Sequence, residues 1–406
     1  MKRRDLRIVW SANSIHSNSG YAVFSQMLLS RMVEDGWPVA HIGWWGIEGV
    51  KLDVDLGQFN PRFKGLTLPI YPRMNEPFGG DALVEHSKDF KADVVFAMQD
   101  LWTINPQYLQ QLPRFVPYFP VDKDPLPLNI AQLLPYCYRL ISFSQFGHDI
   151  LKKSGWASNL ILEGTDTELF KPQDKAQARA QIGIDPNAFV FGMFAANKEN
   201  PPRKGWQEAL EAFAMFYKKH PEALLYCKIQ QRAPTGFPIE SYARYLDISH
   251  RVVFASPYDS VFKGGPLVIS QDMNAIDVHL HPSQTEGFGL TPIEAQSCGT
   301  PTIVADNTSQ PELVIDGLTG WVAKCMKPRY TADDSFVHPA DPQSVYECME
   351  KAYKALKKNP KKVAKDSRDY VLGKYNIDTI YKEKWVPFLE RIQSEILRGL
   401  SPNVTY

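Results

Sequence analysis

Short apolar runs alternate along the chain with longer segments in which apolar residues recur at helical spacing, and this alternation is typical of α/β proteins with parallel sheets. Residues 6–11 predict a first strand, apolar positions from Phe24 to Met32 predict a helix, and residues 39–42 predict the next strand. Further apolar runs predict strands at residues 93–98, 115–119, 139–143, 188–195, 223–229, 251–254 and 275–280.

Three other segments complete the pattern. Residues 46–89 are rich in proline, glycine and aromatic residues without clear periodicity, so long loops with short elements are expected there. A lysine-rich helix is predicted at residues 351–365, most simply as a solvated face. Residues 381–397 carry apolar residues at helical spacing and predict a C-terminal helix.

Length and composition indicate the number of domains and disfavour some partners. A chain of 406 residues with 44% hydrophobic residues is long enough for two cores, so two α/β domains are expected. Basic and acidic residues balance at 45 each, so the net charge does not favour nucleic acid, although a local basic patch stays open as an alternative. Five scattered cysteines without metal-ligand spacing predict ordinary thiols of a reducing compartment and no zinc site.

No apolar run approaches the roughly 18 residues that a transmembrane helix needs. The basic start of the chain is not followed by an apolar segment long enough for a signal sequence. The sequence therefore predicts a cytoplasmic protein without a transmembrane segment.

The strand, helix and strand at the start of the chain raise the question of a dinucleotide site. The polar loop after the first strand contains Ser19 and Gly20, but it lacks the three glycines of the dinucleotide fingerprint. The second strand also ends without the acidic residue that would bind a ribose. Binding of a nicotinamide dinucleotide is therefore not expected.

Residues 281–324 contain the strongest candidate for a ligand site. A predicted strand leads into a glycine-bearing turn with Glu286, and a helix is predicted to begin at Thr291. The unpaired N–H groups of a helix N-terminus, together with glycines that allow close approach, suit a phosphorylated ligand. Glu286 alone could be a solvated turn residue, and Glu294 with Thr291 fits a capping box in which its carboxylate is purely structural.

The whole stretch resembles the donor-site signature of glycosyltransferase family four, whose members are retaining enzymes that use nucleotide-sugar donors. It has the family's Pro-Ser pair, its Gly-Phe-Gly turn and its two glutamates with seven residues between them. The matching residues are Pro282, Ser283, Glu286, Gly287, Phe288, Gly289, Glu294, Ala295, Gly299, Thr300 and Pro301.

The resemblance implies the GT-B fold, in which two Rossmann-like α/β domains face each other and a C-terminal helix returns to the first domain. The expected boundaries are 1–172 for an acceptor-side domain, 173–375 for a nucleotide-sugar donor domain and 376–406 for the returning helix. Residues 162–172 look like the family's entry into the second domain.

The resemblance also implies roles for individual residues. Arg203 and Lys204 are adjacent here, whereas the family spaces them more widely, and both are expected as exposed cations against the donor diphosphate. Glu286 is expected on the hydroxyls of the transferred sugar. Asp122 stands near the place of a family histidine, and a turn-initiating role is equally open for it. These four residues form the expected catalytic set.

The implied donor-binding residues lie in the first loop and around the glycine turn, with Glu294 expected on the ribose hydroxyls. They are Ser19, Gly20, Asn197, Gly287, Phe288, Gly289, Leu290, Thr291 and Glu294. Neither a metal nor another cofactor is expected, because cations and a helix N-terminus can stabilise the leaving diphosphate.

The sequence therefore predicts a retaining glycosyltransferase that moves a sugar from a nucleotide diphosphate to an acceptor. Two alternatives stay open, a nucleotide-sugar epimerase or hydrolase on the same fold and a non-catalytic nucleotide-sugar-binding protein. The acceptor is open among a glycan, a small molecule, a lipid carrier and a modified nucleic-acid base. Residues that could stack on an acceptor, or simply anchor loops, are Trp44, Trp45, Tyr71, Phe78 and Trp102.

Overall fold

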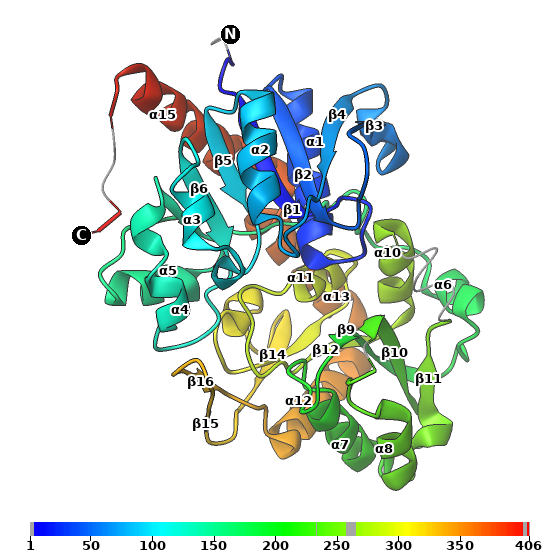
Figure 1. The fold of residues 1–406 in the computed structure, drawn as a ribbon. Coiled ribbons are helices and arrows are strands. Elements are labelled where there is room, and N and C mark those ends of the chain that lie inside the picture. Colours follow the sequence, from blue (N-terminus) through cyan, green and yellow to red (C-terminus); the bar gives the residue numbers. More distant parts are fainter. Residues whose placement is uncertain (1–3, 233, 257–264, 401–403, 406) are drawn as a thin grey trace. The chain divides into compact units, whose positions relative to one another are not determined.

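The chain folds into two compact units, each built around its own sheet (Figure 1). The computed structural model describes residues 4–232, 234–256, 265–400 and 404–405. The first unit comprises Met1–Gly164, Asp333–Ser335 and Ile377–Tyr406, and the second unit comprises Thr165–Ala332 and Phe336–Asn376.

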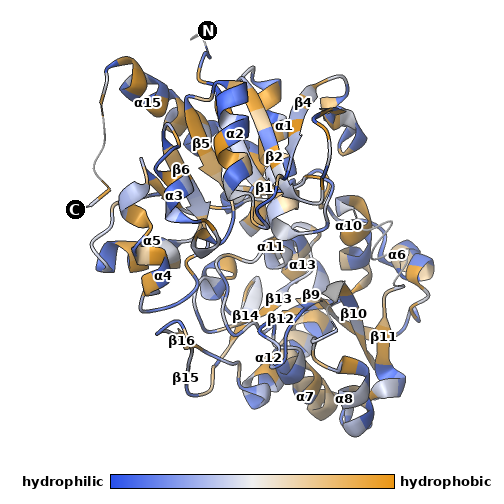
Figure 2. Ribbon diagram, in the orientation of Figure 1, coloured by the Kyte–Doolittle hydropathy of each residue, from blue (hydrophilic) through white to orange (hydrophobic). Residues whose placement is uncertain are grey.

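The first unit contains an eight-stranded sheet in the order β3-β4-β2-β1-β5-β6-β7-β8, parallel except for the antiparallel edge pair of β3 and β4. Its central strands are buried along their whole length, as expected for a parallel sheet covered on both faces, and Figure 2 shows hydrophobic residues concentrated there. The strands are β1 (Ile8–Asn13), β2 (Val39–Trp45), β3 (Leu52–Asp55), β4 (Thr67–Pro72), β5 (Val94–Ala97), β6 (Phe115–Phe119), β7 (Leu140–Ser142) and β8 (Ser158–Leu160).

The helices of the first unit connect these strands and then return from the end of the chain. They are α1 (Gly20–Glu34), α2 (Gly80–Phe90), α3 (Pro106–Leu109), α4 (Leu128–Ala131), α5 (Gln145–Lys153), α14 (Ile377–Ile380) and α15 (Val386–Leu397). Short 3-10 turns also occur, including η3 (Leu101–Thr103), and a π-helical turn at Tyr381–Trp385 joins α14 to α15.

The C-terminal segment packs on the sheet of the first unit, as the resemblance implies. Trp385 is fully buried, and its ring lies 5.7 Å from the ring of Trp10 and 5.3 Å from that of Tyr118. Such edge-to-face contacts bury large apolar areas, so the last helix contributes to the core of the first unit.

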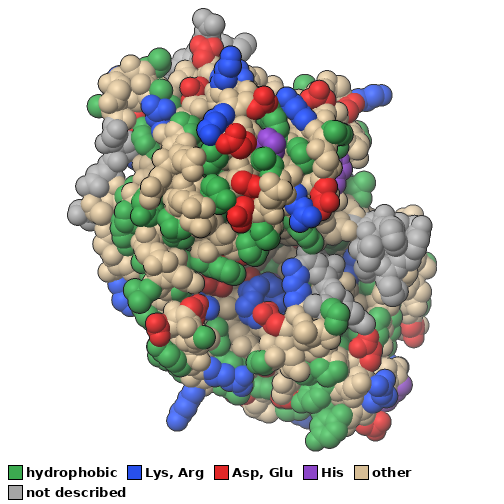
Figure 3. Space-filling view, viewed as in Figure 1, with side chains coloured by type: hydrophobic (Ala, Val, Ile, Leu, Met, Phe, Trp, Pro, Cys, Tyr) green, Lys and Arg blue, Asp and Glu red, His purple; other side chains and the backbone are tan. Residues whose placement is uncertain are grey.

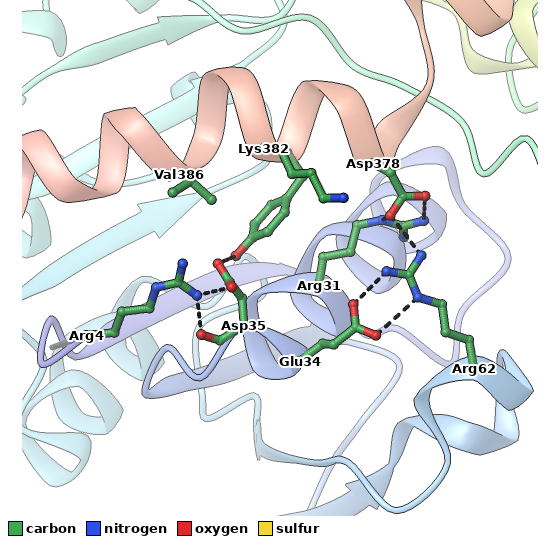
Figure 4. Close-up of a pocket in the computed structure, with 9 residues that line it drawn as sticks. Arg4, Arg31, Glu34, Asp35, Arg62, Asp378, Lys382 and Val386 are labelled. Atoms are coloured by element: carbon green, nitrogen blue, oxygen red, sulfur yellow. Dashed lines mark hydrogen bonds and ion pairs between the residues drawn. The ribbon is translucent and has the colours of Figure 1, made fainter. Parts of the chain in front are cut away.

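Charged residues fix the same segment to the end of α1. The fully buried guanidinium of Arg31 donates two hydrogen bonds of 3.0 Å to Asp378, while Arg62 pairs with Glu34 and with the same Asp378. These groups line a cavity of about 210 Å³ together with Arg4 (Figure 4). The network is thus a structural tie between the start and the end of the first unit.

The expectation for residues 46–89 is wrong in part. The segment contains two strands, β3 and β4, and the 11-residue helix α2. Strand β3 escaped notice because it lies at the edge of the sheet, where only Val54 of its four residues is buried. The start of α2 was obscured by two adjacent glycines, since Gly79 is its N-cap with a positive φ of 73° and Gly80 is its first residue.

The second unit contains a six-stranded parallel sheet in the order β11-β10-β9-β12-β13-β14. Each strand predicted from the apolar runs is present in one sheet or the other, with its ends shifted by a few residues. The strands are β9 (Phe189–Asn197), β10 (Ala223–Arg232), β11 (Val252–Phe254), β12 (Val278–His281), β13 (Thr302–Ala305) and β14 (Gly320–Ala323), with a separate antiparallel pair of β15 (Arg329–Tyr330) and β16 (Phe336–Val337).

Helices cover both faces of this sheet. Alternate residues of β9 point to opposite sides: Phe191 joins a core with α7 and α12, and Phe194 joins a core with α10 and α11. The helices are α6 (Lys175–Ile182), α7 (Trp206–Tyr217), α8 (Ile239–Tyr245), α10 (Pro266–Ala275), α11 (Leu290–Ser297), α12 (Pro342–Lys358) and α13 (Pro360–Lys374). The unit therefore has three layers, and both cores are continuous with the sheet.

Two details of the second unit differ from the sequence expectation. The division between the units falls after residue 164 rather than 172, because Phe170 is fully buried in the second unit's core. The prediction of a single lysine-rich helix at residues 351–365 is wrong, because α12 ends at Lys358 and α13 begins at Pro360. Pro360 has no backbone N–H to continue a helix, and Asn359 caps α13 by accepting from the N–H of Lys362.

Charges on the surface are mixed. Figure 3 shows Lys and Arg side chains interspersed with Asp and Glu side chains on the face that it draws, in keeping with the balanced composition. Among the helices of the described residues, none is both long enough and apolar enough to cross a bilayer.

Candidate active site

Two loops at the carboxyl ends of neighbouring strands meet in the second unit. The loop after β9 carries Arg203 and Lys204, and the loop after β12 carries Glu286. Gly205 has a positive φ of 76°, and a Cβ atom on it would lie 2.0 Å from the carbonyl oxygen of Pro282. Only glycine fits there, because the backbones of the two loops touch. This close approach brings their charged side chains together.

Glu286 is a buried carboxylate held by cations. The Nζ atom of Lys204 lies 2.5 Å from one carboxylate oxygen, and Nη1 of Arg203 lies 3.8 Å from the other. Burial alone would raise the pKa of Glu286, but Lys204, His281 and Arg203 outweigh it and hold the pKa well below its usual value. The alternative of a solvated turn glutamate is therefore wrong, because the side chain is 6% exposed and ionised in a fixed position.

Lys204 is less exposed than its sequence suggests, since only 20% of the side chain is accessible. Burial lowers the pKa of Lys204, and the Glu286 carboxylate opposes that effect. An ammonium has three N–H donors, so the bond to Glu286 leaves two for a ligand. Arg203 is more exposed at 38% and uses Nη1 to donate 3.0 Å to the carbonyl oxygen of Thr285. The two cations face the buried carboxylate of Glu286 and, on the exposed side, the carboxylate of Glu199, which lies 3.5 Å from Nε of Arg203.

His281 belongs to the site, although the sequence indicated it only as the residue after a strand. Its Nε2 atom lies 3.3 Å from the Glu286 carboxylate, and its Nδ1 atom lies 3.3 Å from Oγ1 of Thr291. Burial lowers the pKa of His281, despite the raising effect of Glu286, so the imidazole is neutral at neutral pH. His281 therefore links the buried carboxylate to the first turn of α11.

The glycine turn ends at the N-terminus of α11. Gly289 is the N-cap with a φ of 107°, and a Cβ atom there would lie 3.2 Å from His281. The helix begins at Leu290, so Thr291 lies inside the helix and cannot be the N-cap of a capping box. The N–H groups at such a helix start can face an anion, and the sequence prediction assigns this role to the N–H groups of Gly289 and Leu290.

Glu294 lies in α11 with its side chain 4% exposed. Burial raises the pKa of Glu294 to about 8, and among the described residues its carboxyl group has neither a hydrogen bond nor an ion pair. The capping-box interpretation is wrong, because its expected partner lies inside the same helix. A buried carboxyl group without a partner is unfavourable unless a ligand supplies one.

Glu294 should make stability fall as pH rises. Its pKa is about 8 in the folded protein and lies near 4.5 without the fold, so the folded state binds the proton more tightly between these values. In the wild type, we expect the free energy of unfolding to fall by roughly 2–5 kcal/mol between pH 5 and pH 8 because of Glu294. In Glu294→Gln this fall should be absent. Thermal unfolding of both proteins from pH 5 to pH 9 measures this, and parallel curves would contradict it.

Backbone contacts that the sequence did not reveal hold the glycine turn. Thr308 accepts a 3.0 Å hydrogen bond from the N–H of Glu286. The Ser309 hydroxyl lies 2.9 Å from the carbonyl oxygens of Glu286 and Phe288. Phe288 is buried and packs edge-on against Tyr375 at 5.7 Å. Thr308 and Ser309 thus fix the turn by hydrogen bonds, and Phe288 fixes it by apolar packing.

Asn197 stands at the end of β9, where donor binding was expected. Its amide donates 2.8 Å to the carbonyl oxygen of Phe237 and accepts 2.9 Å from the same residue's N–H. Both polar atoms thus have structural partners, and the side chain is buried. The structure explains Asn197 as a brace between two loops, with no need for a ligand.

Three predicted residues lie in the first unit. Ser19 is the N-cap of α1: its hydroxyl accepts from the N–H of Ala22 at 3.2 Å and from the amide of Asn13 at 2.8 Å. Gly20 is the first residue of the helix and is exposed. Asp122 is half-buried in the loop after β6. All three follow carboxyl ends of strands, the edge where open α/β sheets bind ligands.

Other kinds of site find no support. Within the described parts of the chain, no three His, Cys, Asp or Glu side chains cluster as metal ligands would. All five cysteines are described, and each is a free thiol that is buried or half-buried.

Comparisons with known proteins bear on this geometry. The model of the family described as Glycosyl transferases group 1 matches residues 262–334, the segment with the glycine turn and both glutamates. A D-inositol 3-phosphate glycosyltransferase from Segniliparus rotundus is 30% identical over 175 residues, which is 42% of this chain and 36% of that protein. A second protein of that name, from Catenulispora acidiphila, is 31% identical over 164 residues. The chain thus spans about a third of the length of these relatives.

Solved structures match almost the whole chain. Sucrose-phosphate synthase from Thermosynechococcus elongatus superimposes with a TM-score of 0.73 over 96% of this chain and 100% of that one, at 16% identity. Anabaena HepE in complex with UDP and glucose gives 0.68 over 97% and 100%, at 17% identity. The resemblance and the fold class expected from the sequence are therefore confirmed.

Proposed function

We propose, from the premise that this chain is a group 1 glycosyl transferase with the GT-B fold, that it is a retaining glycosyltransferase with a nucleoside diphosphate sugar as donor. One observation carries the proposal: a buried carboxylate held by two cations lies beside the N-terminus of α11, inside the segment that the family model matches. HepE, which has the same fold, is known in complex with UDP-glucose, and this supports a donor of that class.

The chemistry follows from the charges. The bond between the sugar C1 and the diphosphate oxygen breaks, and negative charge develops on the leaving diphosphate. Arg203, Lys204 and the N–H groups of the first turn of α11 would stabilise that charge. A new bond forms between C1 and an acceptor oxygen, whose proton leaves to solvent. Glu286 would accept from the sugar hydroxyls, and Glu294 from the ribose hydroxyls.

The reaction itself tests the proposal. The protein is incubated with a panel of nucleoside diphosphate sugars and pooled acceptors, and mass spectrometry follows the release of nucleoside diphosphate and the gain of a sugar. Proton NMR of the product should show the anomeric configuration of the donor. A product with inverted configuration would contradict retention, and an altered sugar formed from the donor alone would favour the epimerase alternative.

We expect activity to survive chelation, because protein groups are assigned to the leaving diphosphate. Turnover with and without EDTA, after exhaustive dialysis, measures this. Loss of turnover in EDTA and its return with magnesium or manganese would show that a metal carries the charge instead.

The free thiols and the donor class are consistent with an enzyme of the reducing cytoplasm.

A further inference from the structure

A row of aromatic rings crosses the carboxyl edge of the first unit's sheet. Trp44 is the last residue but one of β2, Phe78 lies just before α2, and Trp102 lies in η3 after β5. The ring centroids of Trp44 and Phe78 are 5.8 Å apart, and those of Phe78 and Trp102 are 6.3 Å apart. Three separate loops therefore bring these rings together.

The row is unusually exposed for rings that touch one another. Phe78 is 40% exposed and Trp102 is 53% exposed. A side chain that served only as a loop anchor would bury most of its ring, since burial of apolar surface is what stabilises an anchor. Trp44 is partly packed against the backbone. Its side chain lies so close to Gly79 that a Cβ atom on this glycine would be only 2.5 Å away. The outer two rings leave apolar surface for another molecule.

Polar atoms without partners accompany the row. Gln99 is 2% exposed and donates to the carbonyl oxygen of Phe78 at 3.4 Å and to Oγ1 of Thr103 at 3.0 Å. Among the described residues, its Oε1 atom has no hydrogen-bond partner, and neither does the indole Nε1 of Trp44. Buried polar groups normally have partners, but both atoms are closed to solvent, so the surface that the row offers to a ligand is that of the exposed rings.

The local charges disfavour a phosphate-rich ligand. The three loops carry two cations, Lys51 and Arg73, against the three carboxylates of Glu48, Glu76 and Asp100, and Asp81 adds a fourth in the first turn of α2. Both cations are engaged, Lys51 with the Tyr71 hydroxyl and Arg73 with Glu48. Nucleic acids bind mainly through cations on their phosphates, and these loops supply none to spare.

We propose that the aromatic row of Trp44, Phe78 and Trp102 binds a neutral sugar ring, so that the acceptor of this enzyme is a carbohydrate. A pyranose has one face of C–H groups, which can cover an exposed aromatic ring, and a rim of hydroxyls, which can stay in contact with water. The claim that the bound sugar is the acceptor rests on the proposed function. The claim that the row binds a sugar does not depend on it.

Binding is tested first, without any donor. Saturation-transfer NMR on the full chain with maltose, cellobiose and lactose should show contact with the ring protons of at least one disaccharide. Trp102→Ala and Phe78→Ala should each weaken that binding about tenfold or more, and Trp102→Phe should restore part of it. Tyr245→Ala is the matched control, since Tyr245 is an 80% exposed ring in the second unit. No signal with any disaccharide, or equal signals in all variants, would overturn the proposal.

Turnover then separates this inference from the proposed function. With a working donor, Trp102→Ala should raise the KM for the disaccharide acceptor about tenfold and leave the affinity for the donor unchanged. Transfer to an oligonucleotide or a lipid in preference to every saccharide would overturn the carbohydrate assignment while leaving the glycosyltransferase intact. Saccharide binding without transfer from any donor would instead refute the proposed function.

Discussion

Arg203→Ala is expected to lower kcat/KM about 10²- to 10³-fold while changing the stability of the fold little. The guanidinium is 38% exposed and lies 3.8 Å from Glu286, so its interaction with that carboxylate is weak. Its main role would be to stabilise the charge that develops on the diphosphate. Steady-state kinetics with a donor and thermal unfolding measure the two effects, and Lys218→Ala, an exposed cation next to the end of α7, is the control.

Lys204→Ala should lower activity at least as much, but it should also destabilise the protein. The sequence alone treats Lys204 as an exposed cation, whereas the structure pairs it with the buried carboxylate of Glu286 at 2.5 Å. Removing one member of such a pair leaves a buried charge and costs roughly 3–5 kcal/mol. The double variant Lys204→Met with Glu286→Gln should regain stability without regaining activity. Wild-type rates in both Arg203→Ala and Lys204→Ala would refute their assignment to the diphosphate.

The two glutamates should respond differently to replacement by glutamine. Glu286→Gln is expected to reduce turnover strongly and to weaken binding of the whole donor, because this residue is assigned to the transferred sugar. It should leave the affinity for the bare nucleoside diphosphate nearly unchanged. Glu294→Gln should weaken both ligands by roughly 1–3 kcal/mol, since ribose hydroxyls favour the ionised carboxylate on binding and a neutral amide accepts their hydrogen bonds less well.

Calorimetric titration with the nucleoside diphosphate and with the intact donor distinguishes these outcomes. The structure sharpens the comparison in two ways. Glu294 is not part of a capping box, and its carboxyl group has no partner among the described residues. If Glu294→Gln binds both ligands as the wild type does, the residue serves stability alone. If Glu286→Gln weakens the bare diphosphate too, its role lies in holding Lys204 rather than the sugar.

Much of the fold could be predicted from the sequence, because the signals are local. A buried parallel strand is a short apolar run, and a covering helix repeats its apolar residues every three or four positions, so strands such as Phe115–Phe119 could be recognised directly. The prediction failed where the local signal was weak: the edge strand β3 is mostly exposed, and α2 begins at the second of two adjacent glycines. The break at Pro360 was local as well and was simply overlooked.

The sequence by itself determined the site's candidate chemistry: a glycine turn before a helix, two glutamates at a fixed spacing, and an adjacent pair of cations 82 positions before the first glutamate. Only the tertiary structure decided what these groups do to one another. The neighbouring positions of β9 and β12 in the sheet bring Lys204 onto Glu286 and place His281 3.3 Å from the same carboxylate, whereas Glu294 is buried and has no partner among the residues that the structure describes. Ionisation and burial depend on which groups meet across the sheet, and strand order, unlike helical or strand periodicity, is not written in any local stretch of the chain.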